Sequence, residues 1–367
     1  MIMMLLRILL FPFTLLYDAV TRFRNHLYNI GYKHSFRFEV PLIGVGNLNV
    51  GGSGKTPMIE YLIKLFVDGN NISILSRGYG RLTRGLRFAN DNETARTIGD
   101  EPLQFFRSFK DKVNVVVCED RAFAIPNILQ EFPQTNLILM DDSFQHRAVN
   151  PQLNILLTEH ASPFYKDFVM PFGKLREARI GARRADIIIV TKCDAKISDS
   201  DMKDIALAIN VVAGDKPVFF TAIQYGYPIL FGGTSNQITP DVILVSGIAN
   251  HISFEDYART NFNVINHFSY KDHHRYTTED LLTIEEFLQS LGKPLSILTT
   301  EKDMVRLLDP EFSEIISSLP WFYIPIETVF IEVNSNELHC ARAMGNTPRC
   351  CGRHRRVVGD GGCRSKV

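Results

Sequence analysis

A glycine-rich segment near the start of the chain constrains the fold most strongly. Residues 45–57 read Val-Gly-Asn-Leu-Asn-Val-Gly-Gly-Ser-Gly-Lys-Thr-Pro, between an apolar run that predicts a strand and a run of helical period over 58–66. The glycines allow successive backbone N–H groups to turn toward one anion, and the helix directs the positive end of its dipole to the same point. A strand, a turn and a helix in this order predict a polyphosphate-binding loop made of Gly51, Gly52, Ser53, Gly54, Lys55 and Thr56.

The residue types at the end of the loop indicate how a nucleotide would be held. Lys55 is expected to reach the terminal phosphates, and Thr56 is expected to hold magnesium. An apolar strand over 137–140 ends in two carboxylates, Asp141 and Asp142, which are the expected partners of such a loop. We assign Asp141 to the magnesium shell, and Asp142 to the reaction space or a second metal.

Short apolar runs alternate with helical stretches along the chain, and this rhythm is typical of a mostly parallel, doubly wound sheet. The predicted fold class is therefore α/β, of the P-loop nucleoside-triphosphate hydrolase type, with a second, smaller α/β domain and an N-terminal amphipathic helix. The predicted strands of the first domain are 43–46, 72–76, 113–118, 137–140, 153–158 and 187–191. Those of the second are 242–246, 263–266 and 295–299, with a helix over 278–291.

Gly, Pro and polar residues are enriched between the two sets of strands, which indicates a domain junction. We predict an amphipathic helix over 1–30, a phosphate-loop domain over 31–225, a linker over 226–240, a smaller domain that closes the cleft over 241–335, and a tail over 336–367.

The composition argues against some classes of function. Lys plus Arg number 40, as do Asp plus Glu, and this balance argues against nonspecific nucleic-acid binding, which needs a basic excess or a basic face. Cys118 and Cys193 lie in or just after apolar runs, and neither indicates a disulfide framework. The other cysteines crowd into the tail, where Cys350, Cys351 and His354 lack the usual spacing of a structural zinc site. We interpret the tail as disordered or aberrant sequence.

The first 28 residues are apolar, but their longest uncharged run, 8–17, is too short to span a bilayer. They predict an amphipathic helix with a kink or break at Pro12. Its apolar face is Leu5, Leu9, Phe13, Leu16, Val20, Phe23 and Leu27, and its opposite face is Arg7, Thr14, Asp18, Thr21 and Asn25. Two interpretations stay open from this pattern: a helix at a membrane interface, or a helix packed on the protein's own core.

Two polar clusters are associated with the ends of predicted elements. Arg77, within Ser-Arg-Gly-Tyr-Gly, follows the second strand and can neutralise a phosphate. Asp100 and Glu101 stand in a Gly-Asp-Glu-Pro turn before a predicted helix, where two acids also favour the helix dipole without any further role.

A loop ahead of the helix over 278–291 carries Asp272, His273 and His274. A histidine oriented by an aspartate for proton transfer is one interpretation, zinc binding with His267 as a further ligand is another, and a solvated polar loop is a third. Thr-Lys-Cys-Asp over 191–194 is similar to the guanine-reading tetrapeptide of GTPases, but it is short enough to occur by chance.

Taken in order along the chain, these motifs resemble the tetraacyldisaccharide 4'-kinases, or lipid A 4'-kinases, from about residue 5 to about residue 335. The ordered set is far more specific than any single motif. Its members are Gly46-Asn-Leu, Gly51-Gly-Ser-Gly-Lys-Thr-Pro57, Arg77-Gly-Tyr-Gly80, Gly99-Asp-Glu-Pro102, Asp141-Asp with Gln145-His146, Leu175-Arg-Glu177, Asp272-His273 and Thr300-Glu-Lys-Asp303.

This resemblance implies transfer of the γ-phosphoryl group of ATP, with Mg²⁺, to the 4'-hydroxyl of a tetraacylated glucosamine disaccharide 1-phosphate in lipid A (lipopolysaccharide) biosynthesis. It also implies a peripheral position at the cytoplasmic face of the bacterial inner membrane through the N-terminal helix. Neither a nucleic acid nor an obligate protein partner is implied.

The resemblance assigns roles to individual residues. Asp100 and His273 would form a dyad across the cleft, in which Asp100 accepts the sugar hydroxyl's proton directly or through His273. Lys55 and Arg77 would complete the catalytic set. The residues expected to contact the substrate or to support the site are Glu101, Gln145, His146, Arg176, Glu177 and Asp272.

The chain departs from the expected pattern at Asn49, where the phosphate loop usually has glycine, and at Arg81, where a further glycine is expected. The main alternative function is a membrane-associated P-loop GTPase switch, supported by residues 191–194. A second alternative is a nucleotide-binding scaffold without transfer activity. Titration of ATP against GTP tests the first alternative, and phosphate transfer to a lipid acceptor tests the second.

Overall fold

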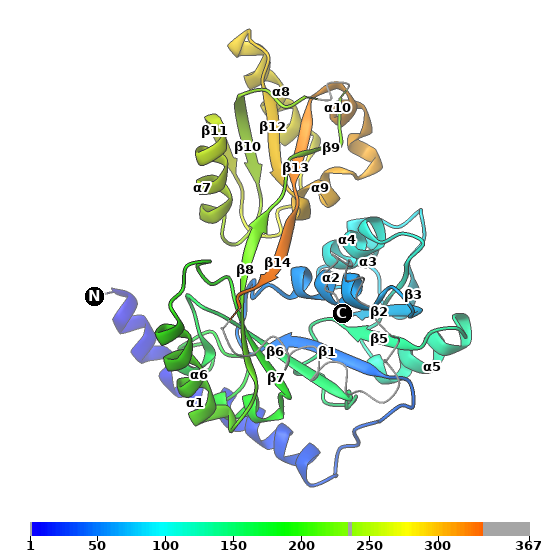
Figure 1. Ribbon diagram of the computed structural model, residues 1–367, viewed down its shortest axis with the longest axis vertical. Helices are drawn as coiled ribbons and strands as arrows, with labels where there is room; N and C mark the ends of the chain where they lie inside the picture. Colours follow the sequence, from blue (N-terminus) through cyan, green and yellow to red (C-terminus); the bar gives the residue numbers. More distant parts are fainter. Residues whose placement is uncertain (1, 234–236, 333–367) are drawn as a thin grey trace, which may run out of the picture.

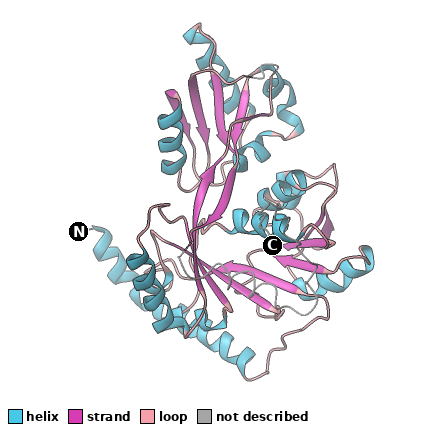
Figure 2. Cartoon of the chain, in the orientation of Figure 1, coloured by secondary structure: helices cyan, strands magenta, loops and turns pink. Residues whose placement is uncertain are grey.

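The structure is a computed structural model that describes residues 2–233 and 237–332, with side chains described from residue 10 onward. Its strands form two sheets with helices packed around them (Figure 1 and Figure 2), and the predicted α/β fold class is confirmed. The predicted tail over 336–367 lies outside the described residues.

The larger sheet, called here the large sheet, has nine strands within the described residues, in the order β14-β8-β7-β6-β1-β5-β2-β4-β3. The inner seven strands are parallel, and β14 and β3 pair antiparallel at the two edges. These strands are β1 (Leu42–Asn47), β2 (Ile72–Ser76), β3 (Arg87–Phe88), β4 (Val113–Val117), β5 (Leu137–Met140), β6 (Leu153–Glu159), β7 (Ile187–Thr191), β8 (Val218–Tyr225) and β14 (Ile326–Phe330). The continuous apolar runs of β1, β2, β5 and β7 are buried on both faces, as a sheet covered by helices on both sides requires.

Because the inner strands are parallel, their carboxyl ends lie at one edge of the large sheet. The glycine-rich loop follows β1, the loop with Arg77 follows β2, and Asp141 follows β5. The helices are α1 (Ile2–Asn29), α2 (Lys55–Phe66), α3 (Ala95–Ile98), α4 (Asp100–Ser108), α5 (Arg121–Glu131), α6 (Asp199–Ala213), α7 (Ile252–Asn261), α8 (Thr278–Leu291), α9 (Glu301–Leu307) and α10 (Ser313–Ser318). Short 3-10 turns occupy Phe164–Lys166, Arg179–Arg184 and Pro310–Phe312.

The smaller sheet, called here the small sheet, has five strands within the described residues, in the order β11-β10-β12-β13-β9. Four are parallel, and the short β9 pairs antiparallel with β13 at one edge. These strands are β9 (Ile229–Leu230), β10 (Asp241–Ser246), β11 (Asn263–Ser269), β12 (Ser296–Thr300) and β13 (Trp321–Ile324). A core that includes Trp321 and Phe312 lies between this sheet and its helices.

The chain passes between the two sheets twice, through β8 on the way out and β14 on the way back (Figure 1). These strands pair with each other, and Gly226 N–H donates to the carbonyl of Pro325 at 2.8 Å beyond them. Two strands belong to a different sheet from the one that the predicted domain boundaries imply. The strand β9 falls within the predicted linker but belongs to the small sheet. Likewise, β14 falls within the predicted smaller domain but belongs to the large sheet. Both strands depend on partners that are distant in sequence, which a local pattern does not record.

The N-terminal helix α1 runs along the outside of the large-sheet half of the molecule (Figure 1). Pro12 lies inside α1, so of the predicted kink or break, a break does not occur there. The apolar side chains of α1 point to solvent, since Phe13, Leu16 and Phe23 are each more than 60% exposed. Its polar side packs on the protein, where Thr14 is buried. No helix among the described residues is long and apolar enough to cross a membrane.

A buried acid lies where helices of the two halves meet. Glu60 on α2 accepts a hydrogen bond from Gln104 Nε2 on α4 at 2.8 Å. Its burial, and then the negative charge of Glu301 on α9, raise the pKa of Glu60 to about 8.

We predict that Glu60→Gln stabilises the protein at alkaline pH, because the amide keeps the acceptor oxygen for Gln104 but carries no charge. In the wild-type protein the folded chain holds a proton that the unfolded chain releases above a pKa of 4.5, so the wild type loses stability relative to the variant as pH rises toward 8. The difference in free energy of unfolding should reach about 1–3 kcal/mol and then level off.

Urea unfolding of both proteins between pH 5 and 9 measures this difference. The exposed Glu131→Gln on α5 is the control, which should track the wild type. A difference that does not change with pH would contradict the assignment.

Candidate active site

The glycine-rich loop joins β1 to α2 and is held in place from β7. Gly54 caps α2 in the left-handed region at φ 82°, and α2 begins at Lys55. Thr191 Oγ1 donates to the carbonyl of Ser53 at 2.9 Å, and Lys192 Nζ donates to the carbonyl of Gly52 at 2.5 Å. The end of β7 therefore fixes the loop backbone with two side-chain hydrogen bonds, which gives residues 191–192 a role that does not involve reading a base.

The contacts of Asn49 account for a residue other than glycine at this position of the loop. Its backbone pairs antiparallel with Leu175, and its Nδ2 donates to Asp167 Oδ2 at 3.2 Å. The side chain is buried and joins the loop to the segment that carries Arg176. The other departure, Arg81, donates to Glu119 Oε1 at 2.6 Å and to the carbonyl of Gly85 at 2.7 Å.

The two carboxylates that follow β5 differ in their surroundings. Asp141 is buried, and its Oδ2 accepts a hydrogen bond from Ser76 Oγ at 3.1 Å. Its Oδ1 is buried and has no hydrogen-bond partner among the described residues. Burial and the charge of Asp142 raise the pKa of Asp141 to about 6. An unpaired, buried carboxylate oxygen beside a phosphate loop fits a divalent cation, which prefers hard oxygen ligands.

Asp142 faces the phosphate loop and is paired with two cations. Both of its carboxylate oxygens accept from Arg176 Nη1 at 2.9 Å, and Oδ1 lies 3.6 Å from Lys55 Nζ. Burial alone would raise the pKa of Asp142, but the charges of Lys55 and Arg176 lower it below its ordinary value. Asp142 therefore stays ionised, and its backbone adopts the left-handed region at φ 44°.

Arg121 supports the acidic pair from beneath, and the sequence analysis missed it. Its side chain is buried, and Nη2 donates to the carbonyls of Asp141 and Asp142 at 2.5 and 3.2 Å. The local sequence, Cys-Glu-Asp-Arg after an apolar run, reads as a helix start, since Asp120 caps α5. Buried arginines are rare, but the burial of Arg121 is visible only in the folded chain, so the sequence alone did not indicate this second role.

The predicted polar residues after Asp142 form a connected group. Gln145 Nε2 donates to the carbonyl of Asn47 at 2.8 Å and approaches Glu177 Oε1 at 3.3 Å. Glu177 is buried and accepts from Arg184 Nη2 at 2.7 Å. Burial and the charge of Arg121 lower the pKa of His146 to about 4, so this imidazole is neutral near pH 7.

Arg77 is exposed at the same edge of the large sheet. Its positive charge contributes to the lowered pKa values of both Arg121 and His146, after burial and other groups.

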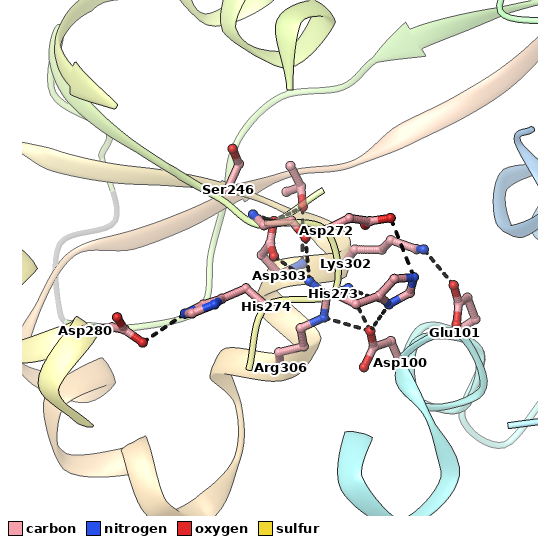
Figure 3. Close-up of polar contacts among 12 residues, drawn as sticks. Asp100, Glu101, Ser246, Asp272, His273, His274, Asp280, Lys302, Asp303 and Arg306 are labelled. Carbon is pink, nitrogen blue, oxygen red and sulfur yellow. Dashed lines mark hydrogen bonds and ion pairs between the residues drawn. The ribbon is translucent and has the colours of Figure 1, made fainter. Parts of the chain in front are cut away.

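The acidic turn and the histidine loop come together across the two sheets (Figure 3). Asp100 is the first residue of α4, and its Oδ2 lies 3.0 Å from Nδ1 of His273. His273 adopts the left-handed region at φ 56°, and its ring meets the first residue of α4. The two residues are 173 positions apart in sequence, so only the packing of the two halves brings them together.

Arg306 on α9 completes this pair, and the sequence analysis did not identify it. Arg306 Nε and Nη2 lie 2.8 and 2.7 Å from the same Oδ2 of Asp100, while Nη1 donates to Asp303 Oδ1 at 2.9 Å (Figure 3). Burial alone would raise the pKa of Asp100, but the hydrogen bond from His273 and the charge of Arg306 lower it to about 2. Because Asp100 is ionised and can only accept, His273 Nδ1 carries the shared hydrogen. The 3.3 Å approach of Arg306 Nη2 to Nδ1 is then a contact of two donors and not a hydrogen bond.

A second ion pair joins α4 to α9. Lys302 Nζ on α9 lies 2.6 Å from Glu101 Oε1. Burial would raise the pKa of Glu101, but the charge of Lys302 lowers it.

Helix α4 is also joined to α2, since Gln104 Nε2 donates to Glu60 Oε1 at 2.8 Å. Asp100 is the first residue of α4 and Lys55 is the first residue of α2, so the Asp100–His273 pair and the phosphate loop are attached to neighbouring helices.

The zinc interpretation of the histidine loop is wrong. His267 lies 2.8 Å from Ser246 Oγ and 2.9 Å from Glu255 Oε2, and His274 lies 3.0 Å from Asp280 Oδ2, away from His273 (Figure 3). Within the part of the chain that the structure describes, no three His, Cys, Asp or Glu side chains are grouped to hold a metal ion. Asp272 is exposed, with Oδ2 at 3.9 Å from His273 Nε2.

Comparisons with known proteins agree on one family. The family model described as tetraacyldisaccharide-1-P 4'-kinase matches residues 6–341. A tetraacyldisaccharide 4'-kinase from Cytophaga hutchinsonii is 39% identical, covering 89% of this chain and 92% of its own. One from Flavobacterium psychrophilum is 41% identical over 89% of this chain and 93% of its own.

A crystal structure of LpxK from Aquifex aeolicus in complex with ATP has a similar fold. The TM-score is 0.70 at 27% identity, and the match covers 93% of this chain and 98% of that chain. With a family match over nearly its whole length, the chain belongs to the tetraacyldisaccharide-1-P 4'-kinase family.

Proposed function

We propose that this chain transfers the γ-phosphoryl group of ATP to the 4'-hydroxyl of a tetraacylated glucosamine disaccharide 1-phosphate in lipid A biosynthesis. The observation that carries the proposal is the Asp100–His273 pair at the start of α4, a helix joined to the one that follows the phosphate loop, because nucleotide binding alone does not require such a pair. The family match supports the identity of the acceptor.

The donor nucleotide is assigned to the phosphate loop. The backbone of the glycine-rich loop and the ammonium of Lys55, the first residue of α2, are proposed to bind its phosphates. Thr56 and the unpaired Oδ1 of Asp141 would hold Mg²⁺, which neutralises phosphate charge and aligns the transferred group when bound. Asp142, held by Arg176, keeps Lys55 within 3.6 Å and limits where its ammonium can lie.

The proton of the acceptor hydroxyl is assigned to Asp100. The contacts from His273 and Arg306 all fall on Oδ2, and we therefore assign Oδ1 to the acceptor hydroxyl. As the sugar oxygen bonds to the γ-phosphorus, its O–H bond breaks and the proton moves to Asp100, while the bond from phosphorus to the bridging oxygen breaks and ADP leaves. A carboxylate with a pKa near 2 is a weak base, so a route through His273 is proposed as well. Nδ1 of His273 already carries the hydrogen shared with Asp100, so Nε2 would take the proton while Asp100 stabilises the resulting imidazolium.

The small sheet with its helices is proposed to close over the site, since His273 and Arg306 both come from that half of the chain. Arg77, Gln145, His146, Arg176, Glu177 and Asp272 are proposed to border the acceptor or to support residues that do. A nucleotide-dependent GTPase switch is not favoured, because Thr191 and Lys192 are engaged with the loop backbone and the family match is to a kinase.

The helix α1 is proposed to rest on the cytoplasmic face of the inner membrane. A helix packed on the protein's own core would bury its apolar side, whereas α1 turns Phe13, Leu16 and Phe23 outward. An exposed apolar strip of this kind is stabilised by a lipid surface, and the acyl chains of the proposed acceptor lie in the same surface.

We predict that Asp100→Asn and His273→Ala each lower kcat by about 10²–10⁴-fold, because proton acceptance is lost. Transfer of ³²P from ATP to the lipid disaccharide in detergent gives kcat, and calorimetry gives the affinity for Mg-ATP, which should change little. Asp199→Asn, at the same first position of α6, is the matched control. Full turnover by the Asp100 variant would refute its role, and absence of lipid phosphorylation by the wild type would refute the proposed function.

We predict that the double variant Phe13→Glu/Leu16→Glu lowers binding to vesicles of phosphatidylethanolamine and phosphatidylglycerol by about tenfold or more, because two charges enter the apolar face. Co-sedimentation measures the bound fraction. Ile252→Glu, an exposed apolar position on α7 in the small-sheet half, should leave binding unchanged. Equal binding of all three proteins would contradict the assignment of the membrane surface to α1.

A further inference from the structure

The side of α1 that faces the protein is polar, and it contacts residues of the candidate active site directly. Thr14 is buried, and Tyr17, Asp18, Thr21 and Asn25 are half-buried, at helical spacing. A helix that only anchored the chain could be attached by apolar packing anywhere on the surface. Instead, α1 turns its apolar side outward and its polar side toward the site.

Asn25 of α1 contacts Glu177, one of the predicted site residues. Its Nδ2 donates to Glu177 Oε2 at 2.6 Å, and its backbone carbonyl accepts from Arg147 Nη1 at 2.9 Å. Glu177 is buried, and its carboxylate also accepts from Arg184 and from Gln145. A hydrogen bond from a neutral amide to a charged carboxylate is stronger than one between two neutral groups.

Tyr17 and Arg24 contact the neighbouring segments. The hydroxyl of Tyr17 donates to the carbonyl of Arg176 at 3.0 Å, and Arg24 Nη2 donates to the carbonyl of Gln145 at 2.8 Å. Tyr17 therefore connects α1 to the backbone of Arg176, and Asn25 connects α1 to the side chain of Glu177.

From this segment the contacts continue to the phosphate loop. Arg176 Nη1 lies 2.9 Å from both carboxylate oxygens of Asp142, and Asp142 Oδ1 lies 3.6 Å from Lys55 Nζ. An unbroken series of polar contacts thus runs from the outer helix to the lysine assigned to the γ-phosphate. If Arg176 shifts, Asp142 loses one of its two cations and draws Lys55 more strongly, away from a bound phosphate.

We propose that Tyr17 and Asn25 are positioning residues that hold Arg176 and Glu177, so that α1 is part of the donor site as well as a membrane-binding element. The inference rests on the proposed function, because it specifies how that site is assembled. It makes the helix that binds the lipid surface a physical support of the catalytic lysine.

The experiment uses the full chain in detergent micelles, where the acceptor is soluble and a bilayer is not needed. The variants are Tyr17→Phe, Asn25→Ala and Asn25→Asp, and the last places a carboxylate against Glu177. The control is Thr21→Ala on the same side of α1, whose hydroxyl donates only to Asp18 of α1 itself among the described contacts.

The expected result is a fall in kcat of about threefold to tenfold for Tyr17→Phe and Asn25→Ala, and a larger fall for Asn25→Asp, while the KM for the lipid changes less than twofold. The stoichiometry of Mg-ATP binding by calorimetry, which counts folded molecules, should stay near one site per chain. Binding to phosphatidylethanolamine and phosphatidylglycerol vesicles should match the wild type, and Thr21→Ala should match it throughout.

Three results would overturn the inference. One is an unchanged kcat for all three variants, and another is an equal fall for Asn25→Ala and Asn25→Asp. The third is a fall in kcat that is matched by a fall in binding stoichiometry, which would mean that the contacts only stabilise the fold. A wild-type protein without lipid phosphorylation would instead refute the proposed function, so the two failures are distinguishable.

Discussion

The pairing of Asp100 with Arg306 and His273 is the interaction on which the arrangement of this protein depends. A carboxylate at the start of α4 is partly buried, and it is kept ionised by a hydrogen bond and a cation from the other half of the chain. Removing Arg306 would leave this carboxylate with only the hydrogen bond from His273 to offset the cost of its partial burial. The same contacts that assemble the site therefore also hold the two sheets together, with Lys302 and Glu101 beside them.

Much of the fold could be predicted because its signals are local. The strands over 72–76, 137–140 and 187–191 and the helix over 278–291 have the predicted bounds, since each is a strong apolar or periodic run between clear breaks. The phosphate loop could be located for a similar reason, because a strand, its turn and the next helix are adjacent in sequence. The parallel order then places the residues that follow β1, β2 and β5 at one edge of the sheet.

The rest depends on contacts that no local pattern encodes. Arg306 acts 206 residues away from Asp100, and the segment around it reads as an ordinary amphipathic helix. Arg121 looked like part of a helix cap until its burial under Asp141 was visible. The amphipathic pattern of α1 was recognised, but the pattern alone is compatible with either side facing the protein. The hydrogen bonds of Tyr17 and Asn25 decide its orientation.

The paired strands β8 and β14 form both connections between the two sheets. Two separate flexible linkers would let the outer half rotate and translate in many directions, and ordering it would cost much conformational entropy. A two-stranded ribbon bends mainly about one axis and resists stretching along its length. The paired ribbon therefore restricts the directions in which the outer half can move, and it favours re-formation of the Asp100–His273 contact in the same register after any such movement.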